Sequence, residues 1–208
     1  MFPTLLSKVS ILLTMSMACG ALGVFFGRAI HSTAAFITLA LTFILGCVGV
    51  YFAAHISTSA GITALVLWTF VSGLFMAPCM EAMSELLGWL AVFLAFAGSA
   101  AAMSVCGVIG MNSGIDFSGW SKYLTFALFG LIIIGVLGLF VQLSRQVNIG
   151  FALMGIVIFS GFFILDFFRL SKAENTWESA TQLTVSIYLD FINVLIRVLE
   201  LIALLKKK

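Results

Sequence analysis

Residues 161–200, GFFILDFFRLSKAENTWESATQLTVSIYLDFINVLIRVLE, place charged side chains inside sequence that is otherwise apolar enough for a membrane interior. Asp166 lies near the end of an uncharged run that begins at Gln146, and Asp190 lies well inside a second apolar run that begins near Ala180. An acid at the centre of a membrane helix costs about 2.5 to 3.5 kcal/mol on insertion scales, so an acid in such a position is usually functional. We therefore predict that Asp166 and Asp190 belong to a functional site.

The second run also carries a line of polar side chains. At about 100° per residue they fall within an arc of roughly 80° on one helical face. The line consists of Gln182, Ser186, Asp190, Asn193, Arg197 and Glu200. Because the other faces are apolar, we expect this helix to show lipid an apolar back and to line a cavity or pathway with its polar face. Ser186, Asn193 and Arg197 are the pathway-lining candidates. Arg197 and Glu200 have the spacing of an ion pair within one helix.

The composition predicts an integral membrane protein. Of the 208 residues, 62% are hydrophobic and 9% are charged, whereas soluble domains average about 45 to 50% and about 25%. At about 20 residues per span, little sequence remains for a soluble domain. We expect one integral membrane domain, residues 1–208, that lies in a lipid bilayer and is monomeric. The net charge of +2, from scattered basic residues, gives no indication of a nucleic-acid partner.

Breaks in the hydropathy predict an all-α membrane protein with seven transmembrane helices. The expected spans are residues 9–27, 33–54, 62–78, 87–109, 123–141, 149–169 and 181–204. The small and polar residues 57–61 are the expected break between the second and third spans. Pro78 is expected to end or kink the third span, because it cannot donate a helix hydrogen bond. We expect the first span to be retained, since its apolar run is long for a signal peptide.

Two acids, Glu81 and Glu85, follow Pro78 in what we interpret as a purely acidic loop. Their spacing would put both on one face if the segment were helical. They form either a solvated turn or a cation-attracting mouth, since acidic rings serve that purpose in cation pores. The four cysteines form no CxxC pair, so we interpret them as small buried side chains and expect no structural metal site and no cofactor.

Four segments resemble the Bax inhibitor-1-like, or transmembrane Bax inhibitor motif, family. Residues 159–174, FSGFFILDFFRLSKAE, resemble the family's sixth helix and the loop after it, and residues 186–202, SIYLDFINVLIRVLELI, are similar to its SLYLDFINLF signature. Residues 70–78, FVSGLFMAP, and 115–124, IDFSGWSKYL, match its third helix and the loop before its fifth. The resemblance covers nearly the whole chain, and its YLDFIN hexapeptide is specific.

The resemblance implies a bundle in which helix seven is central and two aspartates from helices six and seven share a proton. Those positions correspond to Asp166 and Asp190. It further implies, for the bacterial pH-sensitive type, a calcium leak across the plasma (inner) membrane, with calcium bound only in transit and protons as the second ligand. Animal relatives restrain cell death, and another bacterial branch has a membrane protease as its partner.

His55 is the position at which the chain departs from the family pattern. The best-studied bacterial type has an arginine there, at the loop end of helix two, which bonds the aspartate pair in the closed state. An imidazole loses its charge near pH 6.5, whereas a guanidinium does not. We therefore predict that a latch at His55 gives a pH response of different shape. An unchanged pH dependence of ion flux in His55→Arg would contradict this.

The residues support three classes of function. Two neighbouring carboxyls in a poorly hydrated space cannot easily both ionise, which suits a proton-gated cation leak. A regulator of a membrane protease or of stress and cell-death partners, without transport, is the alternative. An intramembrane aspartyl protease also uses paired acids, but the flanks of Asp166 and Asp190 lack a GxGD motif. We therefore expect no enzymatic activity.

Overall fold

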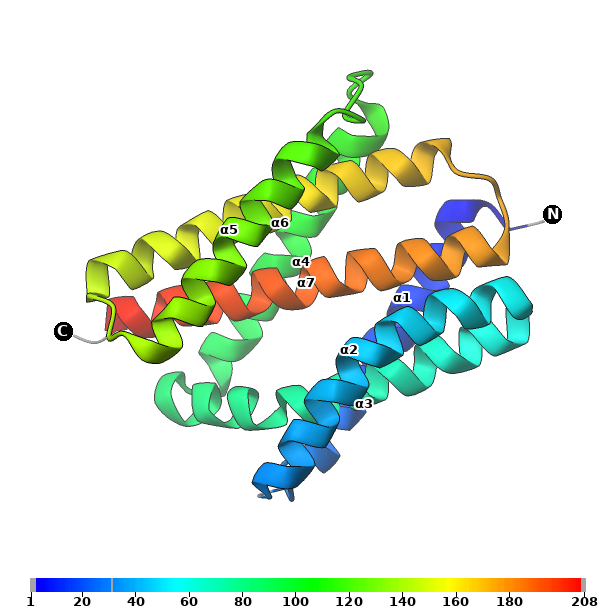
Figure 1. The fold of residues 1–208 in the computed structure, drawn as a ribbon. Helices are drawn as coiled ribbons and strands as arrows, with labels where there is room; N and C mark the ends of the chain where they lie inside the picture. Colours follow the sequence, from blue (N-terminus) through cyan, green and yellow to red (C-terminus); the bar gives the residue numbers. More distant parts are fainter. Residues whose placement is uncertain (1–2, 31, 207–208) are drawn as a thin grey trace. The chain divides into compact units, whose positions relative to one another are not determined.

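The computed structural model describes residues 3–30 and 32–206, and all regular secondary structure in them is helical. Seven helices make up this part of the chain (Figure 1). They are α1 (Leu5–Gly27), α2 (Thr33–Ile56), α3 (Thr58–Leu87), α4 (Trp89–Asn112), α5 (Trp120–Phe140), α6 (Arg145–Lys172) and α7 (Trp177–Lys206). Each helix contains one of the seven expected spans or nearly all of it, so the prediction of an all-α chain with seven helices is confirmed.

Six of these helices, α1 to α6, are long and apolar enough to cross a membrane. The chain is therefore an integral membrane protein. The remaining helix, α7, also has the length of a span, but it carries the charged residues Glu178, Asp190, Arg197, Glu200 and Lys206. That α7 crosses the membrane as a seventh span stays a prediction.

Helix α3 is longer than the sequence indicated. It begins at Thr58, continues through Pro78 and ends at Leu87, so Pro78 does not end the helix. That Pro78 kinks the third span, and that this span covers residues 62–78, stay predictions. Proline is tolerated inside membrane helices because neighbouring groups can compensate for its missing hydrogen bond. The residues after Pro78 include two methionines and two leucines, which are good helix formers.

The break between α2 and α3 is a single residue rather than the five expected. Ser57 has extended backbone angles, φ −163° and ψ 155°. Its side-chain oxygen accepts a hydrogen bond from the Ala60 N–H at 3.2 Å, which is the bond of a helix N-cap. Residues 58–61 therefore already belong to α3, and the small residues there mark its first turn.

The helices group into two compact units, described separately below. Unit 1 comprises Met1–Ala82 and Ala173–Tyr188, and unit 2 comprises Met83–Lys172 and Leu189–Lys208. The boundary falls inside α3 and inside α7, so each of these helices contributes to both units. The expectation of one domain over residues 1–208 stays a prediction.

Unit 1 is built on close packing of α3 against α1 and α2. A Cβ at Gly73 would overlap the Gly20 carbonyl oxygen, so glycine allows the α1 and α3 backbones to touch. On the other side of α3, the Trp68 indole N–H donates to the Phe43 carbonyl at 2.8 Å and the two rings stack. Lys8 of α1 holds the loop before α7 by donating to the Asn175 carbonyl at 2.9 Å.

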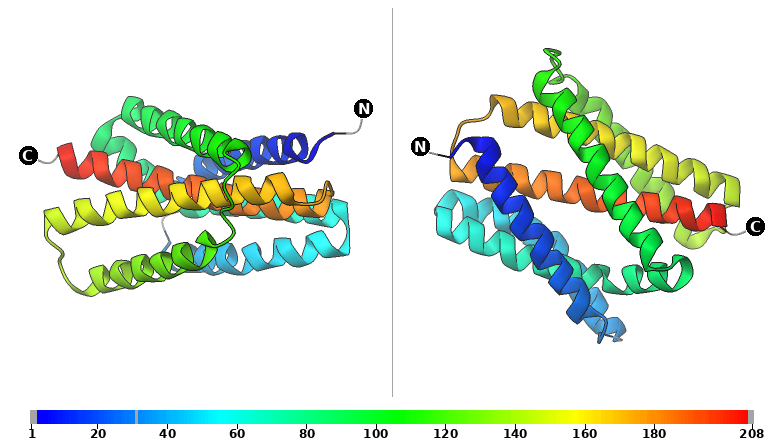
Figure 2. Two further views of the ribbon diagram at one scale, coloured as in Figure 1. Left: turned by 90° about the horizontal axis from the view of Figure 1, so that it is seen from above. Right: turned by 180° about the vertical axis from the view of Figure 1, so that it is seen from behind.

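Unit 2 is built around α6, which contacts both α4 and α5 (Figure 2). A Cβ at Gly110 of α4 would overlap the Ile164 carbonyl oxygen, so α4 and α6 also meet at a glycine. Leu124 of α5 packs onto Gly161 of α6 from another direction. These contacts fix the last turns of α6, where Asp166 lies.

Helix α7 is enclosed on its apolar faces as well as on its polar one. The apolar side chains Tyr188, Phe191, Val194 and Leu199 are all at most 2% exposed. The expectation that this helix shows lipid an apolar back is therefore wrong, since these faces are packed against protein. Periodicity separates a polar face from an apolar one, but it does not tell whether lipid or protein covers the apolar face.

Candidate functional site

Asp166 lies in α6, within unit 2, and is only 1% exposed. Its Oδ1 atom accepts a hydrogen bond from the Arg169 guanidinium at 3.0 Å. The two residues are three apart, which places their side chains on one face of α6. Arg169 also donates to the Ser121 hydroxyl, in the first turn of α5, at 3.2 Å. One guanidinium therefore joins the buried carboxyl to the neighbouring helix.

Asp190 lies in the part of α7 that belongs to unit 2 and is 7% exposed. Its Oδ2 atom is buried and accepts no hydrogen bond from any residue that the structure describes. The charges of Asp166 and Arg169 both act on it electrostatically. Asp166, Asp190 and Arg169, here called the aspartate cluster, thus form one group of interacting charges inside unit 2.

The surroundings of the aspartate cluster are apolar. Phe163, Leu165 and Phe167 of α6 are each at most 9% exposed, and Phe191 follows Asp190 on α7. The ring of Phe191 meets that of Phe96 of α4 edge to face, with the ring centres 5.0 Å apart. Charges interact more strongly in such a poorly hydrated space than in water, so each proton gained or lost should affect the other members.

Arg169 was missed by the sequence reasoning, which placed it only at the end of a span. The signal was present in LDFFRL, where an arginine follows Asp166 by three residues. It was overlooked because a basic residue at the end of a membrane helix ordinarily points to the interface. The side chain is 46% exposed, so its guanidinium joins the buried Asp166 to a more open region.

His55, the predicted latch, lies at the end of α2 and in unit 1. Its Nδ1 atom is 2.6 Å from Glu178 Oε1 in the first turn of α7. The Gln182 side chain lies 3.5 Å from both, at His55 Nε2 and at Glu178 Oε1. The His55 and Glu178 side chains are 63% and 43% exposed. In this structure His55 therefore pairs with an exposed glutamate, and its role as a latch on the aspartates stays a prediction.

The pathway-lining candidates Ser186, Asn193 and Arg197 are all half-buried on α7. Ser186 belongs to unit 1 and the other two to unit 2. Asn193 donates to the Leu189 carbonyl at 2.8 Å, so its amide is turned back onto its own helix. Arg197 pairs with Glu200 at 2.6 Å, as the spacing predicted, and lies over the Phe151 ring, 4.3 Å from its centre. That these side chains line an ion pathway stays a prediction.

The acids Glu81 and Glu85 lie on α3 and not in a loop, so the interpretation as an acidic loop is wrong. Glu81 is half-buried and Glu85 is exposed. The reason is the continuation of α3 beyond Pro78 described above. A role as a cation-attracting mouth stays a prediction.

Among the described residues, no three His, Cys, Asp or Glu side chains come together in a group that could hold a metal ion. The cysteines Cys19, Cys47 and Cys106 are free thiols. The geometry offers two buried carboxyls that interact with one guanidinium, an arrangement that can hold and release protons.

Comparison with known families gives a match over nearly the whole chain. The family model described as inhibitor of apoptosis-promoting Bax1 matches residues 3–207. Both aspartates and all seven helices of the described residues fall inside this range.

Individual relatives are more distant. An uncharacterized protein of Campylobacter jejuni is 28% identical over 136 residues, which cover 65% of this chain and 58% of the relative. An uncharacterized membrane protein of Streptococcus pyogenes is 32% identical over 116 residues, 53% of this chain and 50% of the relative. A Golgi anti-apoptotic protein of vaccinia virus is 32% identical over 117 residues, which cover 56% of this chain and 48% of the relative. The chain thus spans about half the length of the curated relatives it matches.

Proposed function

This chain belongs to the Bax inhibitor-1-like family, described as inhibitors of apoptosis-promoting Bax1, and on that premise we propose that it is a pH-sensitive, calcium-permeable leak channel. The gate is the pair Asp166 and Asp190. The observation that carries the proposal is the burial of both carboxyls beside a single guanidinium, that of Arg169. Burying carboxyls in this way costs stability, and such a cost usually accompanies a function.

The net charge of the aspartate cluster changes by one with each proton that it gains or loses. With one proton on the two carboxyls, their single negative charge and the positive Arg169 cancel. Loss of that proton leaves the cluster with one net negative charge, which attracts a divalent cation. Gain of a second proton leaves one net positive charge, which repels it. The pH of the medium would thereby set the occupancy of the cluster by calcium.

The contacts of Arg169 suggest how proton binding is coupled to movement. In the observed state Arg169 holds Asp166 on α6 and Ser121 on α5. Protonation of Asp166 would remove the charge that holds the guanidinium and would weaken the link between these helices. Charge-assisted hydrogen bonds are about twice as strong as neutral ones, so the link depends on the ionised form.

Calcium flux into liposomes that contain the purified protein tests the proposal. Wild type, Asp166→Asn and Asp190→Asn are compared between about pH 5 and 8, the range around physiological pH. Each variant lacks one titrating group, so its flux should lose the pH dependence of the wild type. Glu178→Gln is the matched control, since it neutralises an exposed acid on α7. Equal flux in wild type and both aspartate variants would exclude the aspartate gate.

A regulator without transport activity is the second candidate. It is favoured by the relative from vaccinia virus, which is named a Golgi anti-apoptotic protein. In that case the chain would act on a membrane protease or on stress and cell-death partners, and no flux above that of empty liposomes would be measured. In either case we propose a non-enzymatic, monomeric protein. The bacterial relatives support the plasma (inner) membrane as its location.

A further inference from the structure

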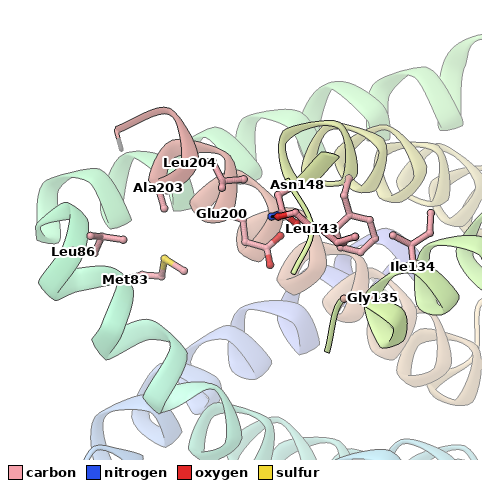
Figure 3. Close-up of a pocket in the computed structure, with 11 residues that line it drawn as sticks. Met83, Leu86, Ile134, Gly135, Leu143, Asn148, Glu200, Ala203 and Leu204 are labelled. Carbon is pink, nitrogen blue, oxygen red and sulfur yellow. Dashed lines mark hydrogen bonds between the residues drawn. The ribbon is translucent and has the colours of Figure 1, made fainter. Parts of the chain in front are cut away.

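Unit 2 contains a cavity of about 380 Å³, at the opposite end of α6 from Asp166 and lined by α3, α5, α6 and α7 (Figure 3). Its walls are largely apolar. They include Met83 and Leu86 of α3, Ile134 and Gly135 of α5, and Ala203 and Leu204 of α7. This volume is in the range of small-molecule sites, about 300 to 1,000 Å³. The cavity lies where α5 and α7 end and α6 begins, which is where a membrane helix bundle meets the interface.

Two cations lie beside the walls of this cavity. The Arg145 Nε–H donates to the Leu204 carbonyl at 2.9 Å, and the Lys206 ammonium donates to the Leu86 carbonyl at 2.8 Å. Both acceptors belong to residues that line the cavity. Both basic side chains are exposed. Each therefore satisfies a carbonyl in the last turn of a helix and retains further N–H donors for a ligand.

The one carboxylate in the cavity wall is already neutralised. Glu200 points into the cavity near Asn148 and Leu143, but its Oε2 atom accepts a bond of 2.6 Å from Arg197. The aliphatic part of Arg197 packs on Gly155 and its guanidinium lies over Phe151. Since the charges of Arg197 and Glu200 cancel, the charges of Arg145 and Lys206 make the neighbourhood of the cavity positive. Glu85 lies between Met83 and Leu86 in the sequence but is not part of the wall.

We propose that this cavity binds one acyl chain of an anionic phospholipid of the surrounding bilayer, with the lipid phosphate held by Arg145 and Lys206. The apolar walls match the acyl chain of the lipid, and the two cations match its phosphate. The guanidinium of Arg145 has its two terminal nitrogens available for two phosphate oxygens, a geometry that arginine provides and lysine does not. Basic pockets between membrane helices bind anionic head groups in the same manner. The proposal does not depend on ion conduction.

Native mass spectrometry of the purified protein in detergent tests whether the protein prefers an anionic phospholipid. Phosphatidylglycerol is the anionic lipid, and phosphatidylcholine with the same acyl chains is the neutral control. The first phosphatidylglycerol should bind at least about fivefold more tightly than the first phosphatidylcholine, since each basic residue near a head group contributes on the order of 1 kcal/mol. Arg145→Gln should reduce this preference about fivefold. Lys122→Gln, a basic residue at the start of α5, is the control and should leave it unchanged.

A second pair of variants tests the acyl-chain part of the proposed site by itself. A Cβ at Gly135 would lie 3.5 Å from Phe151, an ordinary contact, so Gly135→Leu fills the cavity without a backbone clash. Gly130→Leu on the same helix is the control, because a Cβ there meets nothing within 4 Å. Gly135→Leu should weaken binding of the first phosphatidylglycerol by about tenfold, the loss expected when one or two methylene groups no longer find room. Ala203→Leu is the substitute if Gly135→Leu does not yield folded protein.

Equal first-lipid affinity in Gly135→Leu and Gly130→Leu would overturn the assignment of the cavity to an acyl chain. Equal affinity of the wild type for phosphatidylglycerol and phosphatidylcholine would overturn the assignment of Arg145 and Lys206 to a phosphate. Calcium flux measured on the same variants separates this proposal from the leak, because lipid binding can be present or absent whether or not ions pass.

Discussion

The two acids Glu178 and Asp190 lie on one helix, α7, but in different surroundings. Glu178 belongs to unit 1, its side chain is 43% exposed, and it pairs with His55 at 2.6 Å. Asp190 belongs to unit 2, is 7% exposed, and has a buried oxygen that accepts no hydrogen bond from the described residues. Water screens the first acid, so its ion pair contributes little. The second acid interacts with Asp166 and Arg169 in an apolar space, where each charge depends on the others.

This difference indicates that exposure, rather than the presence of a partner, decides how strongly an acid of this protein interacts with the charges around it. Glu178 has the shorter and better-formed contact, yet that contact is exposed to water. Asp190 lacks such a contact, and its burial is a cost that must be offset by the rest of the fold. Four predictions test this view, from the largest expected effect to the smallest.

Replacing Asp190 with leucine should make the protein more stable while the pH-dependent flux is lost. A buried polar group without its hydrogen bonds costs about 1 to 3 kcal/mol, and leucine removes that cost. The free energy of unfolding, measured in detergent by denaturant titration, should rise by a comparable amount. Glu178→Leu is the control and should change stability by less than about 1 kcal/mol, because its ion pair is exposed. A less stable Asp190→Leu would show that this carboxyl is a structural element of the core.

Replacing Arg169 with glutamine should shift the midpoint of the pH dependence of flux upward. Glutamine can still donate to Asp166, but it removes the positive charge that favours ionised carboxyls. An opposite charge within hydrogen-bond distance favours the ionised carboxyl, so its removal should make proton binding easier. Arg145→Gln, at the other end of α6, should leave the midpoint in place. An unchanged midpoint in Arg169→Gln would remove Arg169 from the aspartate cluster.

The His55 and Glu178 pair should contribute little to stability. In a double-mutant cycle of His55→Gln and Glu178→Gln, the coupling energy should lie between about 0.2 and 1 kcal/mol, the range for exposed ion pairs. It should decrease further in high salt, because exposed charges are screened. A coupling energy that is larger than this and insensitive to salt would mean that the pair is shielded from water, and the contrast with Asp190 would fail.

Asp116, in the loop between α4 and α5, should show the smallest effect. The backbone N–H and hydroxyl of Ser118 hold the pKa of this carboxyl below its ordinary value of 3.8, with Lys172 adding a smaller effect. Because the pKa is lower in the folded protein, the ionised carboxyl stabilises the fold above that ordinary value. The stabilisation is lost as the pH falls through the folded pKa. The stability difference between wild type and Asp116→Asn should therefore disappear in strong acid. A difference that persists there would exclude this explanation.

The sequence predicted the helices well because apolar runs of membrane length are long and are separated by small or polar residues. It failed where a single residue had to decide a boundary. Pro78 was expected to end or kink a span, and α3 continues through it to Leu87. Ser57 alone separates α2 from α3, since its side chain caps the helix that follows.

For the candidate site, the sequence identified the two buried acids because charge is conspicuous in apolar sequence. It did not identify Arg169 as a neighbour of Asp166, or Glu178 as the residue that His55 contacts in this structure. The role of His55 as a latch stays a prediction. Which partner a charged side chain takes depends on distances between helices, and hydropathy contains no such distances.

The sequence by itself thus determined that this is a membrane protein of seven helices with two acids in costly positions, since local composition and spacing set helix length and burial cost. Only the tertiary structure decided what surrounds those acids. Glycine contacts, such as that of Gly110 in α4 with α6, fix how closely two helices approach. That distance determines which charges share an apolar space and which remain in water.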